Sequence, residues 1–292
     1  MTHFLQLIVS GTATGSCYAL AALGFTLLWQ ASGTINFALG EMIMLPAFIM
    51  LFCVNVAGLS LPVAFLVTVV ASMIVLGGGF KLLVVDPLSR HGVIPLVIAT
   101  LGLSIGLKNL VRVGYSAQVF TFPALFSDDL LSVGALRVSI ADVGTLAVAI
   151  LIALAVQAFL GRTLTGRAMQ AVAQNRDAAR VLGINAGRMV LYAFLINAAL
   201  AATTALLVTP VYLAKFDMGD TLGLKAFYAA IIGGFNNSRG ALLGGVLVGV
   251  LENLVGAYIS PGYKEGVALV LFLAVIVFRP QGLLGRADER KV

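Results

Sequence analysis

The sequence contains runs of uncharged residues that are long enough to cross a lipid bilayer. Residues 1–40 and 42–80 contain no Asp, Glu, Lys or Arg, and neither do residues 143–161 and 189–214. A helix needs about 20 apolar residues to cross roughly 30 Å of hydrocarbon. Only 10% of the residues are charged, whereas soluble domains carry about 25%. The sequence therefore predicts an all-α, polytopic helical membrane protein that forms one transmembrane domain over residues 1–292.

The apolar runs predict nine helices, and the seventh of them is too short to span a bilayer alone. That helix is expected to be re-entrant or to borrow residues from Pro210 onward, so we expect eight or nine transmembrane or re-entrant helices. A β-barrel is excluded, because barrel strands alternate apolar and polar residues and these runs do not. The expected helices cover residues 4–28, 40–56, 61–80, 94–111, 143–160, 189–213, 224–235, 241–257 and 266–278.

Lysine and arginine are distributed unevenly between the two sets of loops. If residues 162–188 are cytoplasmic, alternation of the spans places twelve of these cations inside and six outside, the six including Lys108 and Lys225. Cytoplasmic loops of membrane proteins are enriched in Lys and Arg. We therefore expect a multi-pass protein of the inner (plasma) membrane, with its N-terminus outside and its C-terminus in the cytoplasm. The same bias explains the net charge of +6 without a nucleic-acid partner.

Glycine is abundant and is often spaced by four residues, which would let helix backbones approach closely. The pairs are Gly11/Gly15, Gly102/Gly106, Gly240/Gly244 and Gly245/Gly249. The longest expected outside segment, residues 112–142, contains turn residues and is expected to hold a small surface structure.

One charged segment interrupts the apolar sequence. Residues 161–188 contain five arginines and one aspartate, so they carry a net charge of +4 and cannot lie inside the bilayer. Small and apolar residues nevertheless recur there at helical spacing. They are Ala168, Ala171 and Val172, and then Ala178, Val181 and Leu182.

The local signals divide this segment into two short helices joined by a turn. Asn175 is expected to be the N-cap of the second helix, with Asp177 in its first turn, where a negative charge suits the helix dipole. Gly183 supplies the left-handed residue that ends it. With the small residues facing outward, the segment would dock onto another protein, and its arginines would bind carboxylates and carbonyls there. Composition leaves open a basic loop that only fixes topology and contacts anionic lipid.

Four sequence patterns resemble those of the permease subunits of ABC importers for branched-chain amino acids and related small polar solutes. In chain order they are GFTLLWQASGTINFALGEMIMLPAF (residues 24–48), RAMQAVAQNRDAARVLGI (167–184), KAFYAAIIGGFNNSRGALLGG (225–245) and FRPQGLLG (278–285). The resemblance covers nearly the whole chain. One departure is Leu39, where the family commonly has a polar residue, often histidine.

The resemblance implies that residues 162–188 are a cytoplasmic coupling loop that contacts a separate ATPase subunit. The matching positions for coupling are Arg167, Ala171, Asp177, Ala178 and Gly183. The implied partners are cytoplasmic ATPase subunits, a second permease subunit that is related or identical, and a periplasmic solute-binding protein. The chain itself has no GxxxxGK[S/T] loop, so we expect no cofactor on this chain and ATP to be used by the partner subunits.

Four residues are candidates for the solute pathway, because polar and ionisable groups in spans are costly and often functional. Asn36 is expected to cap the second helix and Gly40 to relax its backbone, with Glu41 at its start. Glu252 lies within an apolar run of a later span. Two structural alternatives remain open. Glu41 could simply begin a helix at the membrane interface, and Glu252 could be bound by a polar group of a neighbouring helix.

A proton-coupled secondary transporter that uses Glu41 or Glu252 as proton carrier is the alternative function. An intramembrane enzyme is disfavoured, because no HExxH or GxSxG motif and no paired intramembrane aspartates occur. Cys17 and Cys53 fall within expected spans and are interpreted as small packing residues rather than metal ligands.

Overall fold

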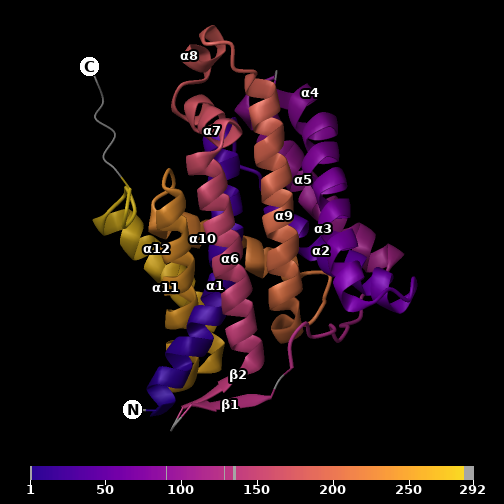
Figure 1. Cartoon of the computed structure of the whole chain (residues 1–292), viewed down its shortest axis with the longest axis vertical. Coiled ribbons are helices and arrows are strands. Elements are labelled where there is room, and N and C mark those ends of the chain that lie inside the picture. Colours follow the sequence, from indigo (N-terminus) through magenta and orange to yellow (C-terminus); the bar gives the residue numbers. More distant parts are fainter. Residues whose placement is uncertain (1, 90, 128, 134–135, 286–292) are drawn as a thin grey trace. The chain divides into compact units, whose positions relative to one another are not determined.

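The structure is a computed structural model that describes residues 2–89, 91–127, 129–133 and 136–285. Arg90, Arg286, Arg290 and Lys291, four of the cations expected inside, lie outside the described residues. Helices dominate the described residues (Figure 1). The elements are α1 (Thr2–Ser32), α2 (Leu39–Asn55), α3 (Leu61–Ser72), the π-helices η1 (Met73–Gly79) and η2 (Lys81–Val85), α4 (Asp86–Ser89), α5 (Val93–Gly114), β1 (Leu130–Val133), β2 (Leu136–Ser139), α6 (Ile140–Arg162), α7 (Leu164–Gln174), α8 (Arg176–Val181), α9 (Ala186–Tyr212), α10 (Met218–Gly233), α11 (Ser238–Tyr258), the 3-10 helix η3 (Pro261–Tyr263) and α12 (Lys264–Phe278).

Seven helical stretches among the described residues are long and apolar enough to cross a membrane. They are α1, the continuous stretch Leu61–Ser89, α5, α6, α9, α11 and the stretch Pro261–Phe278. Helices α2 and α10 are shorter, with 17 and 16 residues. These nine stretches correspond one to one to the nine expected helices, so the prediction of an all-α polytopic membrane protein is confirmed.

The described strands form one antiparallel hairpin, in which Leu130 pairs with Ser139 and Val133 with Leu136. The hairpin falls within residues 112–142, where the sequence predicts a small surface structure.

The chain divides into two compact units. Unit 1 comprises Met1–Thr26, Phe126–Ala153 and Leu224–Val292, and unit 2 comprises Leu27–Leu125 and Leu154–Gly223. Helices α1, α6 and α10 contribute residues to both units. The expectation of a single domain stays a prediction.

Helix α9 is the central helix of unit 2 and packs against α2, α3 and η1. Gly77 in η1 permits the closest of these approaches, because a Cβ atom there would lie 3.0 Å from the Cα atom of Leu195 in α9. One turn further, the rings of Phe80 and Phe194 lie 5.8 Å apart. Helix α8 extends beyond the first turn of α9 at one end of this unit, and α7 lies beside α9 (Figure 1).

Glycines bring α1 and α11 together in unit 1. A Cβ atom on Gly11 would lie 2.8 Å from the Cα atom of Val250, and one on Gly15 would lie 2.8 Å from that of Val246. On the facing helix, Gly249 lies against the backbone of Gly15. The predicted close approach of backbones is therefore confirmed at these glycines.

The pair Gly102/Gly106 differs from the others, because nothing lies within 4 Å of the position that either Cβ atom would take. The prediction of close packing is wrong for this pair in the described structure. Both glycines lie in α5, which exposes large apolar side chains such as Ile98 and Ile105. This face of α5 is available to lipid or to another apolar helix.

We predict that Gly15→Leu lowers the stability of the protein in detergent by about 1–3 kcal/mol, the usual cost of forcing extra atoms into a packed contact. The measurement is the midpoint of thermal unfolding. Gly102→Leu is the matched control, because the same side chain enters open space in α5, which is also a candidate membrane span. An equal loss in both variants would contradict the packing role of Gly15.

Candidate functional site

Three side-chain caps shape the charged segment between α6 and α9. The Thr163 hydroxyl accepts a hydrogen bond from the Gly166 amide (2.9 Å) at the start of α7. The Asn175 side chain accepts from the amides of Asp177 (3.1 Å) and Ala178 (2.9 Å) at the start of α8. The two predicted short helices and the Asn175 cap are therefore confirmed, and each cap satisfies amides that the first helical turn leaves unpaired.

Gly183 ends α8 in the left-handed conformation, with φ of +81°. Two residues later, the Asn185 side chain accepts a hydrogen bond from the Arg188 amide (3.1 Å) and begins α9. The positive φ explains the glycine, because a side chain in this region of φ costs about 1–2 kcal/mol. Gly183 itself is exposed, as are Arg167, Asp177 and Ala178.

The inner face of the segment fixes α7 and α8 to α9. Val172, Ala179 and Ala186 are buried in one apolar cluster, and Ala171 packs against it from the side. The sequence pattern places Ala171 and Val172 on an outward face, and this is wrong. A helical pattern identifies a shared face but not the direction in which it points. Here the end of α9 supplies an apolar surface that covers the face.

Two exposed apolar residues of the segment lie at the C-terminal end of α8. Val181 is 88% exposed and Leu182 is 78% exposed. Beside them, Arg180 lies 3.2 Å from Asp177, so this pair orders one arginine on the surface. Two large apolar side chains among arginines outside the predicted spans have the composition of a protein-docking surface.

A second polar region lies at the start of α2. The Asn36 side chain does not cap α2, because the N-cap residue is Ala38 and no side-chain cap is made there. Instead, the Asn36 Oδ1 atom accepts from the Ala38 amide (3.0 Å), and its Nδ2 atom lies 3.4 Å from the Met42 Sδ atom. The predicted capping role is therefore wrong, and Asn36 closes the extended turn before the helix.

Gly40 brings the start of α2 into backbone contact with the start of α10. A Cβ atom on Gly40 would collide with the carbonyl group of Gly219, and one on Gly223 would lie 2.7 Å from the Gly40 Cα atom. Gly40 is thus required for a close helix approach rather than for a relaxed backbone.

The next residue, Glu41, is 2% exposed. Ser104 is its polar neighbour, and Lys108 and Asp220 are its charged neighbours. Lys108 in turn pairs with Asp220. Glu41 is a candidate from its sequence pattern, whereas Asp220 is not, and Lys108 is expected only as a cation of the outside set.

Glu252 lies in a different cluster, inside unit 1. Its carboxylate is 3.0 Å and 3.1 Å from the Lys225 Nζ atom, measured to Oε1 and Oε2, and both side chains are about 95% buried. The Tyr18 hydroxyl donates a hydrogen bond to Oε2 (3.0 Å). The geometry agrees with the structural alternative, in which neighbouring helices satisfy the Glu252 carboxylate. The placement of Lys225 in an outside loop is wrong, since this lysine is 4% exposed within α10.

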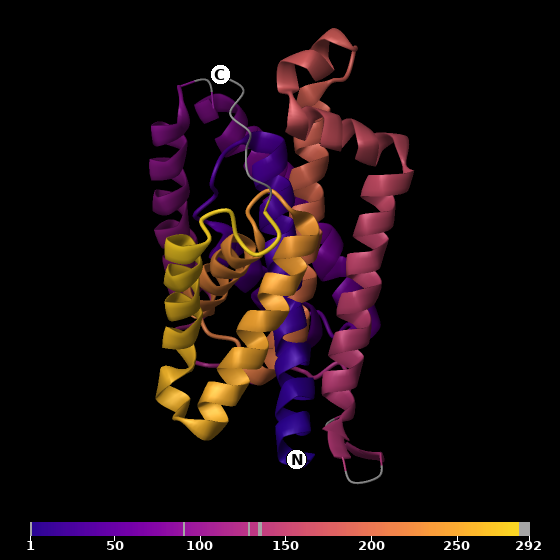
Figure 2. The ribbon, with the colours of Figure 1, turned by 90° about the vertical axis from the view of Figure 1, so that its left-hand side faces the viewer.

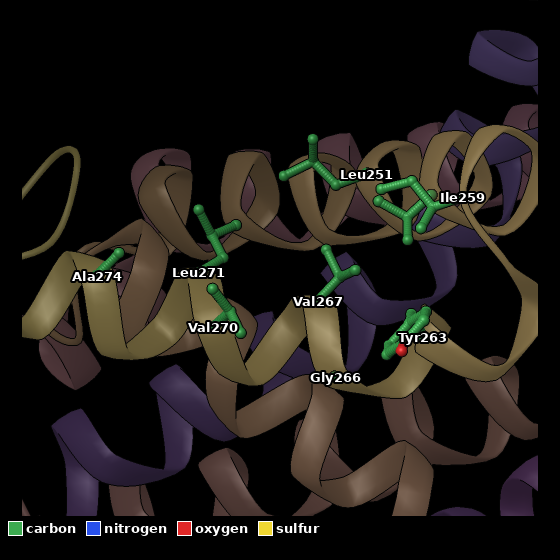
Figure 3. A pocket seen from close by; sticks show the side chains of 9 residues that line it. Leu251, Ile259, Tyr263, Gly266, Val267, Val270, Leu271 and Ala274 are labelled. Atoms are coloured by element: carbon green, nitrogen blue, oxygen red, sulfur yellow. The ribbon is translucent and has the colours of Figure 1, made fainter.

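Neither polar region has the ligands of a metal centre. Among the described residues, no three His, Cys, Asp or Glu side chains group as metal ligands. Helices α11 and α12 are neighbours (Figure 2). A groove between them, of about 510 Å³, is lined by hydrocarbon side chains such as Leu251, Ile259 and Val267 (Figure 3). Without a polar group other than the Tyr263 hydroxyl, this groove does not suit a polar solute.

We predict that Lys225→Met lowers the free energy of unfolding by about 3–5 kcal/mol, because it leaves the Glu252 carboxylate buried without its cation. Glu252→Leu should cost a similar amount. The double variant should lose far less than the sum of the two. A double-mutant cycle from denaturation in detergent measures the coupling, and Lys215→Met is the control, since its partly exposed pair with Asp217 should contribute less than about 1 kcal/mol. Additive losses would show that the two charges do not support each other.

The chain is similar to known transport proteins over almost its whole length. It matches the family described as "Branched-chain amino acid transport system / permease component" over residues 7–276. It is 34% identical to the high-affinity branched-chain amino acid transport system permease protein BraD of Pseudomonas aeruginosa, over 99% of this chain and 98% of that protein. It is 31% identical to the corresponding protein LivH of Escherichia coli, with the same coverage. The autoinducer 2 import system permease protein LsrC of Yersinia enterocolitica is 28% identical over 94% of this chain and 74% of that protein.

These matches cover both compact units and agree with the helical, multi-pass structure, so the chain is a transport subunit of the inner membrane rather than an enzyme. It belongs to the family of permease components of branched-chain amino acid transport systems.

Proposed function

We propose that this chain is the transmembrane subunit of an ABC importer that moves branched-chain amino acids or a related small polar solute into the cytoplasm. Separate ATPase subunits drive it, a second permease subunit completes the pathway, and a periplasmic binding protein delivers the solute. The printed names of BraD and LivH support the amino-acid class. The name of LsrC, an autoinducer 2 import permease, shows that a relative of this chain handles a different solute.

The charged segment carries this proposal. It is built as a rigid unit by the Thr163, Asn175 and Asn185 caps, and it exposes Val181 and Leu182 beyond the helices that could span a membrane. Large exposed apolar side chains outside the bilayer are unfavourable unless a partner covers them. A chain without a nucleotide-binding loop of its own needs such a surface to receive the motion of an ATPase.

The order of the helices supports the proposed orientation. If the two short helices count as crossings, nine crossings place the termini on opposite sides. The charged segment follows the fifth crossing and therefore shares a side with the C-terminus. The burial of Lys225 removes one cation from the outside set, and the burial of Lys81 removes one from the inside set. The count becomes eleven inside against five outside. Both arguments favour an outside N-terminus and a cytoplasmic charged segment.

The proton-coupled alternative gains no support. Family membership assigns the chain to a class of permease components, and Glu252 is held by Lys225 and Tyr18 in a buried ion pair.

We predict that Val181→Asp together with Leu182→Asp reduces binding of the ATPase subunits at least tenfold and reduces solute-stimulated ATP hydrolysis to the same extent. The reason is that two carboxylates replace the exposed apolar surface of α8. Co-purification and ATP hydrolysis in proteoliposomes are the measurements. Gln170→Asp together with Gln174→Asp is the matched control, because it adds the same charge to exposed polar positions on α7.

Both variants should retain the melting temperature of the wild-type chain, since the substituted side chains are exposed. The docking role is wrong if the α8 variant binds the ATPase subunits normally. Uptake that proceeds at full rate without any ATPase subunit would refute the importer as a whole.

A further inference from the structure

The two short helices, α2 and α10, begin with the same sequence pattern. Residues 37–41 read FALGE at the start of α2, and residues 216–220 read FDMGD at the start of α10. Each pattern has an aromatic residue, an unbranched or γ-branched apolar residue, a glycine and an acid at the same spacing. The pattern therefore occurs twice, at the two places where a short apolar helix begins.

The surrounding helices repeat in the same order. A long helix precedes each short one, and two spans follow it: α1, α2, Leu61–Ser89 and α5 in the first half, and α9, α10, α11 and α12 in the second. The first set starts at crossing one and the second at crossing six, so the two sets enter the membrane from opposite sides. In transporters with inverted repeats, interrupted helices meet at the solute site.

The two helix starts meet in this structure. Gly40 is in backbone contact with Gly219 and Gly223, all within unit 2. The N-terminus of a helix carries a partial charge of about +0.5 and unpaired amide groups. Two N-termini in contact therefore present a region that attracts an anionic group from both sides.

Three ionisable side chains of unit 2 lie at this junction. Lys108 pairs with Asp220, with side chains 32% and 47% exposed, and Glu41 lies behind them, 2% exposed. One cation thus faces two anions, and the two helix N-termini balance the excess negative charge. The neighbouring Asp217 lies 3.8 Å from its own cation, Lys215.

A buried amide beside the junction has an unused acceptor. Asn197 of α9 is 1% exposed, and its Oδ1 atom has no hydrogen-bond partner. Its Nδ2 atom lies 3.7 Å from the Met42 Sδ atom, so the amide is directed at the first turn of α2. An unpaired buried acceptor costs about 1–3 kcal/mol. A hydrogen-bond donor on a ligand that reaches this Oδ1 atom would remove that cost.

We propose that the junction of α2 and α10 binds a zwitterionic amino acid, with its ammonium group at Glu41 and Asp220 and its carboxylate at Lys108 and the helix N-termini. The Lys108–Asp220 pair makes this exchange possible, because an ammonium and a carboxylate can replace the two partners without changing the net charge of the site. The inference rests on the proposed importer function and names its substrate class. It excludes urea and neutral amides, which cannot replace an ion pair.

Ligand protection tests the substrate class. The complex of this chain with its partner permease and ATPase subunits is heated in detergent, without binding protein, in the presence of millimolar L-leucine, L-leucinamide or 4-methylpentanoate. A bound ligand raises the melting temperature by mass action. We expect a rise with L-leucine and none with the two analogues, each of which lacks one of the charges. Equal shifts with all three compounds, or no shift with L-leucine, would overturn the proposal.

Uptake of L-leucine into proteoliposomes tests the residues. Glu41→Gln should reduce uptake at least tenfold and abolish the protection by L-leucine. Glu265→Gln is the matched control, because Glu265 is an exposed acid in the first turn of α12, and it should leave both unchanged.

The charge swap Lys108→Asp with Asp220→Lys separates binding from support of the fold. The swapped pair keeps an ion pair between α5 and α10, so a purely structural role predicts near-normal uptake. We expect a normal melting temperature with uptake still at least tenfold reduced, because the swap replaces the Asp220 carboxylate, which is proposed to bind the ammonium group, by a cation. Normal uptake in the swap or in Glu41→Gln would overturn the site. Binding of the ATPase subunits is measured in the same preparations. Normal binding together with normal uptake in the variants would show that only the proposed solute site is wrong. Absence of binding, even with the wild-type chain, would show that the importer function is wrong.

Discussion

The backbone contact of Gly40 with Gly219 and Gly223 is the constraint on which unit 2 depends. It holds two helix starts together, and each is preceded by an extended segment whose amides no helix satisfies. Irregular backbone at membrane depth is tolerated only where protein covers it or where it lines a cavity. The structure meets this demand locally, since the Phe37 amide donates to Thr100 and the segment before α10 pairs through Ala214 with Phe120.

The two units treat ionisable side chains differently. In unit 1, Glu252 has its cation and a tyrosine hydroxyl within about 3 Å and almost no exposure, so the carboxylate is fixed by partners of its own chain. In unit 2, the Lys108–Asp220 pair is partly exposed, and Glu41 lies behind it. A partly exposed pair can change partners at lower cost than a buried pair, because separating a buried pair leaves two uncompensated charges in hydrocarbon. The first arrangement suits support of the fold and the second suits exchange with a solute.

Local features could be predicted from the sequence, because local chemistry determines them. The spans follow from uncharged runs, and Asn175 and Gly183 define the ends of α8 by capping and by positive φ. Contacts between distant residues could not be predicted. Glu252 is 27 residues from Lys225 and 234 from Tyr18, and no periodic pattern in one sequence connects them. The role of Asn36 could not be predicted either, because a short polar side chain before a helix can close a turn as readily as it caps the helix.

The cluster of Val172, Ala179 and Ala186 has a mechanical consequence. It makes α7 and α8 an extension of α9, a helix of 27 residues that is about 40 Å long and packs against α2 over part of that length. A force applied at Val181 is therefore transmitted along one stiff helix toward the start of α2. The atoms nearest to Gly40 at this contact are backbone atoms of Gly219. Such a contact can shift by about an ångström, which is the size of helix shifts in switching proteins, without any change of rotamer. The movement transmitted by α9 would therefore arrive at a contact that can slide.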